Sequence, residues 1–483
     1  MQLDKKELYS IKKSIEKILK KKSLTPIEIS NSLLHVHRCQ SDFLLRYTDS
    51  VVPQTNYLEK AKKTQSKLTF SWFNIFSFKT EKKPYNSFYD VLIISHFVSK
   101  KNNLYYKDFY FAQIIDSLLK KDYKIKVVYI DDADKNILDN IIDKNDCLSY
   151  DILSNKLPIY RCVLFLSGIL VQSLIYRFIS LISINQEKKQ FYRIISQMES
   201  SWTNLCTSYK IGKIVKADRP KFLFTTFEGQ AYERLIYFYS KIFCNNIVRV
   251  GYFHAAIFEH QFSVKQSFGK KFDPDLILTQ GNFSSKILSK VYNKVDTGVI
   301  AVGAPRTIMY RIENEKKDAI LVIPSGILTE VIYLLEFSIE LSNLMPEFTI
   351  HFRFHPSFDL KLVHPIFSIK QLPSNFIISN QSLESDSSLC KFTLYRDSTA
   401  IFNAVALGSL PIYIRKVDEE ILVNPIYGIS DIVPEIYSPI EFKRKMDFLV
   451  TLDVNLFTCR IQDIVSNYQE NSFYNAINTV LPR

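Results

Sequence analysis

Two polar clusters in the second half of the chain could bind an anion, because each directly follows an apolar run. Residues 353–356 offer a guanidinium and an imidazole, and residues 396–399 end in two hydroxyl groups. Such runs are typical of buried strands in a parallel sheet, whose carboxyl ends meet at one edge. A cation, an imidazole and hydroxyls at that edge suit the phosphate of a nucleotide. Ser325 and Gly326 follow another apolar run and would allow close backbone approach, which is a weak signal alone.

Two parts of these clusters also have a plainer explanation. His355 and Pro356 could form a loop whose histidine caps a local group, and Ser398 could be an ordinary helix N-cap. Alternatively, Ser398 and Thr399 open the predicted helix 400–407, where hydroxyl and backbone N–H groups can point at the same phosphate. The sequence leaves both explanations open.

The candidates for acid–base chemistry lie in the first half of the chain. Glu228 and Gly229 follow an apolar run, and a partly desolvated glutamate can take a proton from a hydroxyl group. Capping of a helix is the alternative for Glu228. His254 follows the next run and could bind a phosphate or carboxylate or act as an acid, or it could be a core histidine. Glu233 and Arg234 could pair with each other on a helix face.

The elements that must position these residues alternate between strands and helices. The predicted strands are 89–96, 125–130, 222–226, 247–252, 276–279, 299–302, 320–323, 349–354, 376–378, 392–395 and 410–414. The predicted helices include 109–119, 328–344, 400–407 and those that close the chain within 436–480. This alternation predicts an α/β fold with two doubly wound, Rossmann-type lobes that face a central cleft.

The length of 483 residues exceeds one ordinary domain. Residues 1–84 are predicted to form a helical and basic N-terminal region, and residues 85–312 a first Rossmann-like lobe. The charged run 313–318 marks the boundary to a second such lobe at 313–435, and residues 436–483 are predicted to be closing helices. Ligands of doubly wound lobes bind at the carboxyl ends of the strands, where the polar residues above are found.

The composition narrows the classes of function. A net charge of +13 suits anionic partners, although a lysine-rich proteome would also produce it. The signatures of nucleic-acid binding are absent from the sequence, so no nucleic acid is expected. The seven cysteines never form a CxxC pair, which indicates reduced thiols in the cytoplasm, and no signal peptide is visible. Asp131 and Asp132 follow an early predicted strand, and Asp132 forms a short DxD pattern with Asp134, but no metal is expected.

Two segments bear on membrane contact. Residues 59–83 contain seven lysines and two acids around an aromatic cluster, which suits an anionic membrane surface; packing against the protein body is the alternative. Residues 160–184 are long and apolar enough to span a bilayer, but Gln172 and Arg177 interrupt the centre. Because an inserted arginine is costly, we expect a buried or interfacial helix there.

This layout resembles GT-B glycosyltransferases. More narrowly, it is similar to bacterial sialyltransferases and Kdo transferases, which use CMP-activated acidic sugars. Those enzymes carry an acidic residue before a glycine that supplies the general base, an HP motif that contacts CMP, and a Ser/Thr pair that binds its phosphate. Glu228-Gly229 looks like the first motif, His355-Pro356 like the second and Ser398-Thr399 like the third, in the same order along roughly residues 89–440.

There is one departure from that pattern, and there is a second resemblance. The first motif of the family often has two acids before the glycine, whereas Phe227 stands in the first of those places here. Residues 303–306, together with residues 353–356, also resemble CDP-glycerol glycerophosphotransferases and other surface-polymer GT-B enzymes. Arg306 is therefore expected to line the cleft with Gly229.

The resemblance implies an inverting, metal-independent and cofactor-free transfer of a ulosonic or nonulosonic acid from a CMP-sugar to a bacterial surface glycan. Glu228 would be the base, with His254 beside it in a catalytic role. Arg353 and His355 would neutralise the CMP phosphate. Further expected donor contacts are Ser325, Gly326, Pro356, Ser398 and Thr399. The enzyme would act in the cytoplasm, at the inner face of the membrane, on a glycan or lipid-linked glycan. The alternatives are a CDP-glycerol or UDP-sugar donor, or a non-catalytic nucleotide- or glycan-binding subunit of a polymer assembly complex.

Overall fold

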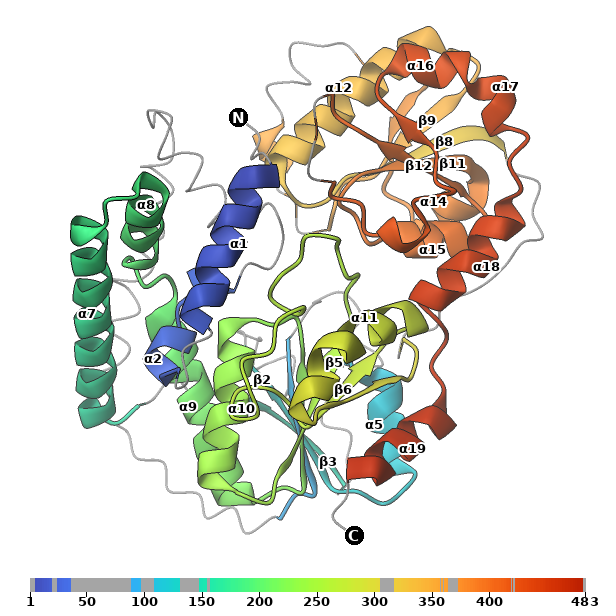
Figure 1. Ribbon diagram of the computed structural model, residues 1–483. Coiled ribbons are helices and arrows are strands. Elements are labelled where there is room, and N and C mark those ends of the chain that lie inside the picture. The colour runs from blue at the N-terminus through green and yellow to red at the C-terminus, as the bar shows by residue number, and fades with distance from the viewer. Residues whose placement is uncertain are drawn as a thin grey trace.

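Two parallel β-sheets form the framework of the protein, one in each lobe (Figure 1). The computed structural model describes residues 5–19, 24–35, 88–96, 108–130, 147–153, 157–304, 317–356, 358, 360–363, 372–417, 419 and 422–480. The seven-stranded first sheet has the order β3-β2-β1-β4-β5-β6-β7, and the six-stranded second sheet has the order β10-β9-β8-β11-β12-β13. Both sheets confirm the expected fold class of two doubly wound α/β lobes.

The strands coincide with the apolar runs of the sequence. Those of the first sheet are β1 (Val91–Ser95), β2 (Ile125–Tyr129), β3 (Leu148–Ile152), β4 (Phe222–Thr226), β5 (Val248–Phe253), β6 (Leu276–Thr279) and β7 (Gly298–Ala301). Those of the second sheet are β8 (Lys317–Ile323), β9 (Thr349–Phe352), β10 (Phe376–Ile378), β11 (Cys390–Tyr395), β12 (Leu410–Ile414) and β13 (Glu435–Ile436). Every residue of the central strands β1, β4 and β5 is buried, as expected for strands covered on both faces.

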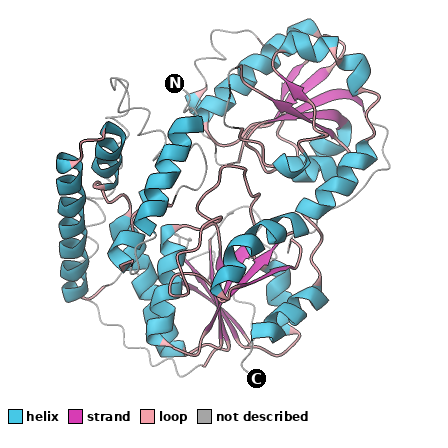
Figure 2. Cartoon of the chain, in the orientation of Figure 1, coloured by secondary structure: helices cyan, strands magenta, loops and turns pink. Residues whose placement is uncertain are grey.

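Helices cover both faces of each sheet (Figure 2). The helices of the first lobe include α5 (Ala112–Leu119), α9 (Ser201–Asp218), α10 (Ala231–Phe243) and α11 (Asn282–Tyr292). Those of the second lobe include α12 (Leu328–Leu344), α14 (Leu383–Leu389), α15 (Ile401–Ala406), α16 (Pro439–Arg444), α17 (Met446–Leu449) and α18 (Val454–Ile464). Alternate residues of β1 enter different cores: Ile93 packs with Ile114 of α5, and Ile94 packs with Ile211 of α9.

The strand order of each sheet reverses at one point. In the first sheet β1 lies between β2 and β4, and in the second sheet β8 lies between β9 and β11. In such sheets the loops on the two sides of the reversal diverge and leave a crevice at the carboxyl ends of the strands. The crevices are therefore expected beside the ends of β1 and β4 and beside the ends of β8 and β11.

Further helices form a layer on one side of the first lobe. They are α1 (Lys5–Leu19), α2 (Pro26–Ile29), the short 3-10 helix η1 (Ser32–Leu34), α7 (Ile159–Ile182) and α8 (Gln186–Ile195), and Figure 1 shows them at the left. Ile11 and Ile15 of α1 are buried against Phe191 and Ile194 of α8, which confirms a helical start to the chain. The basic segment 59–83 and Asp131-Asp132 lie outside the described residues.

Helix α7 corresponds to the apolar segment 160–184, but it is not a buried helix. Its buried residues are Phe165, Tyr176 and Ser180, whereas large apolar side chains elsewhere along it are exposed. Within the described part of the chain, it is the one helix whose length and apolar composition would suffice to cross a membrane. The expectation that this helix is buried was therefore wrong, and the alternative of an interfacial helix stays a prediction.

The end of the chain returns to the first lobe. Helix α19 (Glu470–Val480) places Phe473, Ala476 and Ile477 in the core that β1, β2 and β4 share with α5. By contrast, α18 contributes Phe457 and Ile461 to the core of the second lobe. The closing helices are therefore divided between the two lobes.

Candidate active site

Glu228 and His254 meet at the carboxyl edge of the first sheet. Their strands are neighbours, with Thr226 opposite Tyr252, and the N–H of Phe227 donates to the carbonyl oxygen of Tyr252 at 2.9 Å. Oε1 of Glu228 lies 3.3 Å from Nε2 of His254, and both side chains are partly exposed. The structure thus brings the two predicted catalytic residues into direct contact.

The imidazole of His254 is oriented by this contact. Its Nδ1 atom is buried and has no hydrogen-bond partner, while Nε2 faces the carboxylate of Glu228. A buried imine nitrogen without a partner costs less than a buried N–H without one, so the proton fits best on Nε2. In that tautomer Nε2 of His254 donates to the carboxylate of Glu228. His254 is also partly exposed, unlike a histidine that is enclosed in a core.

The loop that carries Glu228 has a fixed shape. Gly229 has φ = +77°, and a Cβ atom there would lie 2.4 Å from the carbonyl oxygen of Ser263. The hydroxyl of Ser263 donates to the carbonyl oxygen of Glu228 at 2.8 Å. Nδ1 of His35, next to η1, lies 3.1 Å from the carbonyl oxygen of Gly229. Glycine is therefore required here by both conformation and space.

Glu233, in the first turn of α10, binds the backbone of the same loop. Its carboxylate is fully buried and accepts from the N–H groups of Glu228 and Gln230, both at 2.9 Å, and from the hydroxyl of Thr226 at 3.2 Å. Burial, and then the negative charge of Glu228, raise the pKa of Glu233 to about 8. Glu233 thus satisfies the N–H groups before α10, whereas the carboxylate of Glu228 faces His254.

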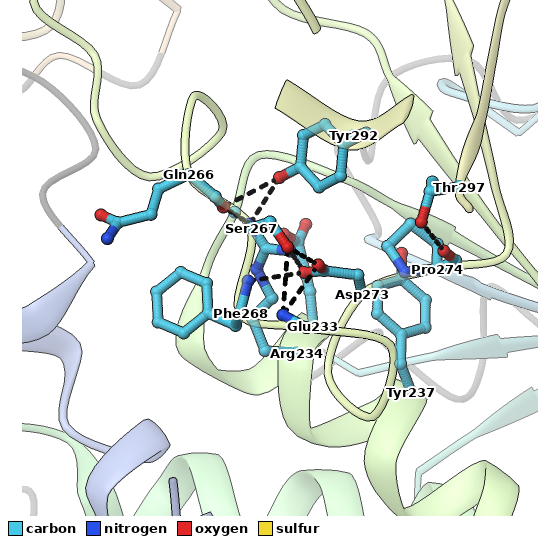
Figure 3. A network of polar contacts seen from close by, with 12 residues as sticks. Glu233, Arg234, Tyr237, Gln266, Ser267, Phe268, Asp273, Pro274, Tyr292 and Thr297 are labelled. Atoms are coloured by element: carbon cyan, nitrogen blue, oxygen red, sulfur yellow. Dashed lines mark hydrogen bonds and ion pairs between the residues drawn. The ribbon is translucent and has the colours of Figure 1, made fainter. Parts of the chain in front are cut away.

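Arg234 does not pair with Glu233, contrary to the simple expectation for neighbours on a helix. It is fully buried and forms an ion pair with Asp273, which Figure 3 shows in its hydrogen-bond network. It also donates to the carbonyl oxygen of Ser263 at 2.9 Å and to the hydroxyl of Tyr292 at 2.8 Å. Arg234 therefore fastens the segment that supports Gly229.

Tyr110 packs against His254 and links it to two further aromatic residues, His96 and Tyr232. The ring of Tyr110 stands edge-on to His254 with centroids 4.4 Å apart, and edge-on to His96 at 6.3 Å. Nε2 of His96 lies 2.9 Å from the hydroxyl of Tyr232. His96 directly follows β1, beside the point where the strand order reverses. A histidine at the end of a predicted strand is the one sequence signal that could have indicated it. Sequence reasoning gave no role to any of the three.

The pair of Glu228 and His254 lies on the side of the first lobe that meets the second. Ala256 and Phe258, only a few residues after His254, are buried in the core of the second lobe. Nζ of Lys265 lies 3.4 Å from the hydroxyl of Tyr427 across the same boundary. In Figure 1, α11 and α15 lie on the sides of their lobes that are turned toward each other.

The second sheet brings its three predicted loops to one edge. Val322 of β8 is opposite both Phe352 of β9 and Leu394 of β11, so the three strands end side by side. The residues that follow differ in exposure. Ser325 and Ser398 are buried, while Gly326, His355, Pro356 and Thr399 are exposed. Arg306 lies outside the described residues.

Both arginines of the two clusters have protein partners. Arg353 donates to the carbonyl oxygen of Gln381 and, at 3.4 Å, to Asp386, a fully buried carboxylate of α14. Arg396 is buried between Glu330 and Glu419. Arg353 is partly exposed, so it keeps access to a ligand, whereas Arg396 holds the loop in place.

The helix after Ser398 is shorter than predicted. Helix α15 has 6 residues, begins after Ala400, and has no side-chain cap. Ser398 is therefore not an N-cap, which removes the plainer explanation for its hydroxyl group. A helix this short also has a weak dipole, so the two hydroxyls are the main donors that this loop offers.

No family model and no curated protein matches the sequence. Among solved structures the chain is similar to the calicheamicin glycosyltransferase CalG4, with 12% identity, 82% of this chain and 99% of that one covered, and a TM-score of 0.49. It is also similar to the glycosyltransferase of kitacinnamycin (11%, 81% and 99%, 0.47). A putative UDP-N-acetylglucosamine 2-epimerase from Listeria monocytogenes gives similar values (10%, 81% and 96%, 0.48). Scores of this size say nothing about activity, and the fold assignment rests on the strand order of the two sheets.

Proposed function

We propose that the protein is an inverting, metal-independent glycosyltransferase that moves an acidic sugar from a CMP-sugar to a surface-glycan acceptor. The observation that carries this proposal is the contact between Glu228 and His254 at 3.3 Å, close to the segment that packs against the second lobe. A base in that place can reach an acceptor bound to one lobe and a donor bound to the other. The choice of CMP rests on the motif resemblance.

In the proposed reaction, the acceptor hydroxyl attacks the anomeric carbon of the donor sugar. Its proton passes to the carboxylate of Glu228, and the new glycosidic bond forms as the bond from the sugar to the CMP phosphate breaks. The bonding electron pair leaves with CMP, and attack from the opposite face inverts the anomeric centre. His254, which donates to Glu228, holds the carboxylate in position and stabilises its charge until the proton arrives.

The donor would lie across the three loops at the edge of the second sheet. The hydroxyls of Ser398 and Thr399 would donate to the CMP phosphate, and His355 with Arg353 would neutralise its charge. Ser325 and Gly326 would allow the nucleotide to approach the backbone. The neighbouring ends of β8, β9 and β11 support this arrangement.

We also place the enzyme at the inner face of the cytoplasmic membrane, as a peripheral protein close to lipid-linked acceptors. The lysine-rich and aromatic residues 59–83 support this part of the proposal by composition alone.

The base is tested by Glu228→Gln, with Glu340→Gln as the matched control, since Glu340 is an exposed residue of α12. Loss of a general base is expected to reduce transfer from a CMP-sugar by about 10²–10⁴-fold, while CMP affinity and thermal midpoint stay near wild type. The control should keep full activity. Near-wild-type transfer by Glu228→Gln would remove Glu228 from this role.

The donor is tested by thermal shift with CMP, CDP, UDP and GDP. Stabilisation by CMP alone, lost in both His355→Ala and Ser398→Ala, supports the proposal. Stabilisation by UDP or CDP instead would replace CMP by the alternative donors. No shift with any nucleotide would favour a non-catalytic subunit, and unchanged CMP affinity in both variants would place the donor site elsewhere.

A further inference from the structure

Helix α7 presents apolar side chains to the outside along its whole length. The largest exposed fractions include Leu181 at 76%, Phe178 at 62%, Leu170 at 61% and Leu174 at 55%. These positions recur at intervals of three and four residues, so they form one stripe on the helix. We call this stripe, from Tyr160 to Ile182, the α7 stripe. Figure 1 shows that α7 is the outermost element on its side of the protein. Patches of this extent mark interaction surfaces.

Two serines of α7 point the opposite way. Ser173 donates to the carbonyl oxygen of Ser196 at 2.6 Å, and Ser180 donates to that of Lys189 at 2.7 Å. On the same inner side, Gly168 lies so close to Ile27 that a Cβ atom would be 2.9 Å from its Cδ1 atom. Helix α7 therefore buries several polar groups against the protein and exposes apolar ones, the reverse of a helix whose outer face meets water.

We propose that the α7 stripe lies flat in the surface layer of an anionic lipid bilayer. Arg177 distinguishes this arrangement from a contact with α7 of a second copy of the chain. It is exposed in the stripe, between Leu174 and Leu181, and α7 contains no acidic residue. In a dry contact between two copies of α7, Arg177 would have no carboxylate of either helix to pair with, which is costly. At a bilayer it can extend to a lipid phosphate while its methylene groups stay among apolar atoms.

The next helix adds charge of the right sign. Lys188, Lys189 and Arg193 of α8 are exposed, close to the carboxyl end of α7. The carboxylate of Glu187 accepts from the hydroxyl of Ser10 at 2.6 Å and so is held toward α1. Lysine and arginine beside an inserted apolar stripe strengthen binding to anionic headgroups.

A flat position is favoured over a crossing by the connections of α7. Strand β3 precedes it and α9 with β4 follows it, and both β3 and β4 belong to the first sheet. A single crossing would put strands of one sheet on opposite sides of the bilayer. No second candidate span is present in the described part of the chain to bring it back. The helix can therefore touch the bilayer only from one side.

The first experiment is co-sedimentation of the full chain with vesicles of phosphatidylcholine alone or mixed with phosphatidylglycerol. The test variant is Leu174→Ser with Phe178→Ser. Its matched control is Ile440→Ser with Phe448→Ser, because these second-lobe residues are similarly exposed, at 64% and 57%. We expect binding to the mixed vesicles, weakened about tenfold or more in the α7 variant and unchanged in the control, with equal thermal midpoints. Equal binding by both variants, or no binding by wild type, overturns the proposal.

A second measurement separates α7 from residues 59–83, which could hold the chain on vesicles by themselves. Phe178→Trp, with wild-type fluorescence subtracted, should be quenched by brominated mixed vesicles, and Phe448→Trp should not. Absence of quenching in Phe178→Trp overturns the proposal even where the protein sediments. A blue-shifted Phe178→Trp in a dimer without lipid would do the same, because a second copy would then cover the stripe. The proposal does not depend on the transferase activity, so either can fail without the other.

Discussion

At the scale of single residues, Gly229 constrains the position of Glu228. Its φ of +77° is unfavourable for any residue with a Cβ atom, and such an atom would also lie 2.4 Å from the carbonyl oxygen of Ser263. We expect Gly229→Ala to lower the free energy of unfolding by more than the roughly 1–2 kcal/mol of the backbone conformation alone. It should also reduce activity, because the loop must shift to relieve the clash. Urea denaturation and transfer assays measure the two effects.

Gly269 supplies a matched control for that substitution. Its φ of +86° carries a similar conformational cost, but a Cβ atom there would meet nothing within 4 Å. Gly269→Ala should therefore show the backbone cost alone and keep its activity. If the two variants are equally stable and equally active, the contact with Ser263 does not constrain the loop.

At the scale of elements, the first turn of α10 is predicted to give stability its own pH dependence. The folded pKa of Glu233 is raised to about 8, from an ordinary value of 4.5. Between these two values the carboxyl group of Glu233 keeps its proton in the folded state but has lost it in the unfolded state. The contribution of this group to stability is therefore complete below pH 4.5 and disappears as the pH rises through 8. Glu233→Gln removes it. Between about pH 5 and pH 8.5, the free energy of unfolding of wild type should therefore fall relative to that of the variant.

The same urea titrations contain the check on that prediction. Every other titratable group is common to both proteins, so the difference isolates Glu233 and the groups coupled to it. A difference that stays constant across this pH range would mean that Glu233 keeps an ordinary pKa in the folded protein.

The elements also show how far the sequence could be interpreted. Every predicted strand is present, because central strands buried on both faces are continuous apolar runs. Strand β3 was missed because it is an edge strand with no fully buried residue, and β13 because it has only 2 residues. The contact of Glu228 with His254 followed from adjacent strands. The partner of Arg234 did not, because Asp273 is distant in the chain and only the folded loop brings it near.

Helix α7 and Ser398 show a second kind of limit. An apolar stretch has the same composition whether its side chains face the protein or the outside, so the exposure of α7 needed the packing of α2 and α8. A serine before a predicted helix looks like an N-cap until the helix start is known to within a residue. Both cases depend on geometry that composition and periodicity do not contain.

At the scale of the whole molecule, the last helix fastens the chain back onto its first lobe. Phe473 of α19 is fully buried, and its ring centroid lies 6.2 Å from that of Phe224 in β4. The chain therefore passes from the first lobe to the second and returns to the first. Gly303 supports the return, because a Cβ atom there would lie 2.1 Å from the carbonyl oxygen of Asn467.

Phe473→Ala is accordingly expected to destabilise the first lobe, although the residue belongs to the end of the chain. Loss of a buried phenylalanine costs about 3–5 kcal/mol, since the cavity that it leaves closes only in part. Amide exchange followed by peptide should show faster opening of β1, β2 and β4, with the second lobe near wild type. Phe448→Ala in α17 is the control, because that ring is 57% exposed and should cost less than about 0.5 kcal/mol. Uniform opening of both lobes, or protection of the first lobe equal to that in the control, would show that α19 does not stabilise the first lobe as a separate unit.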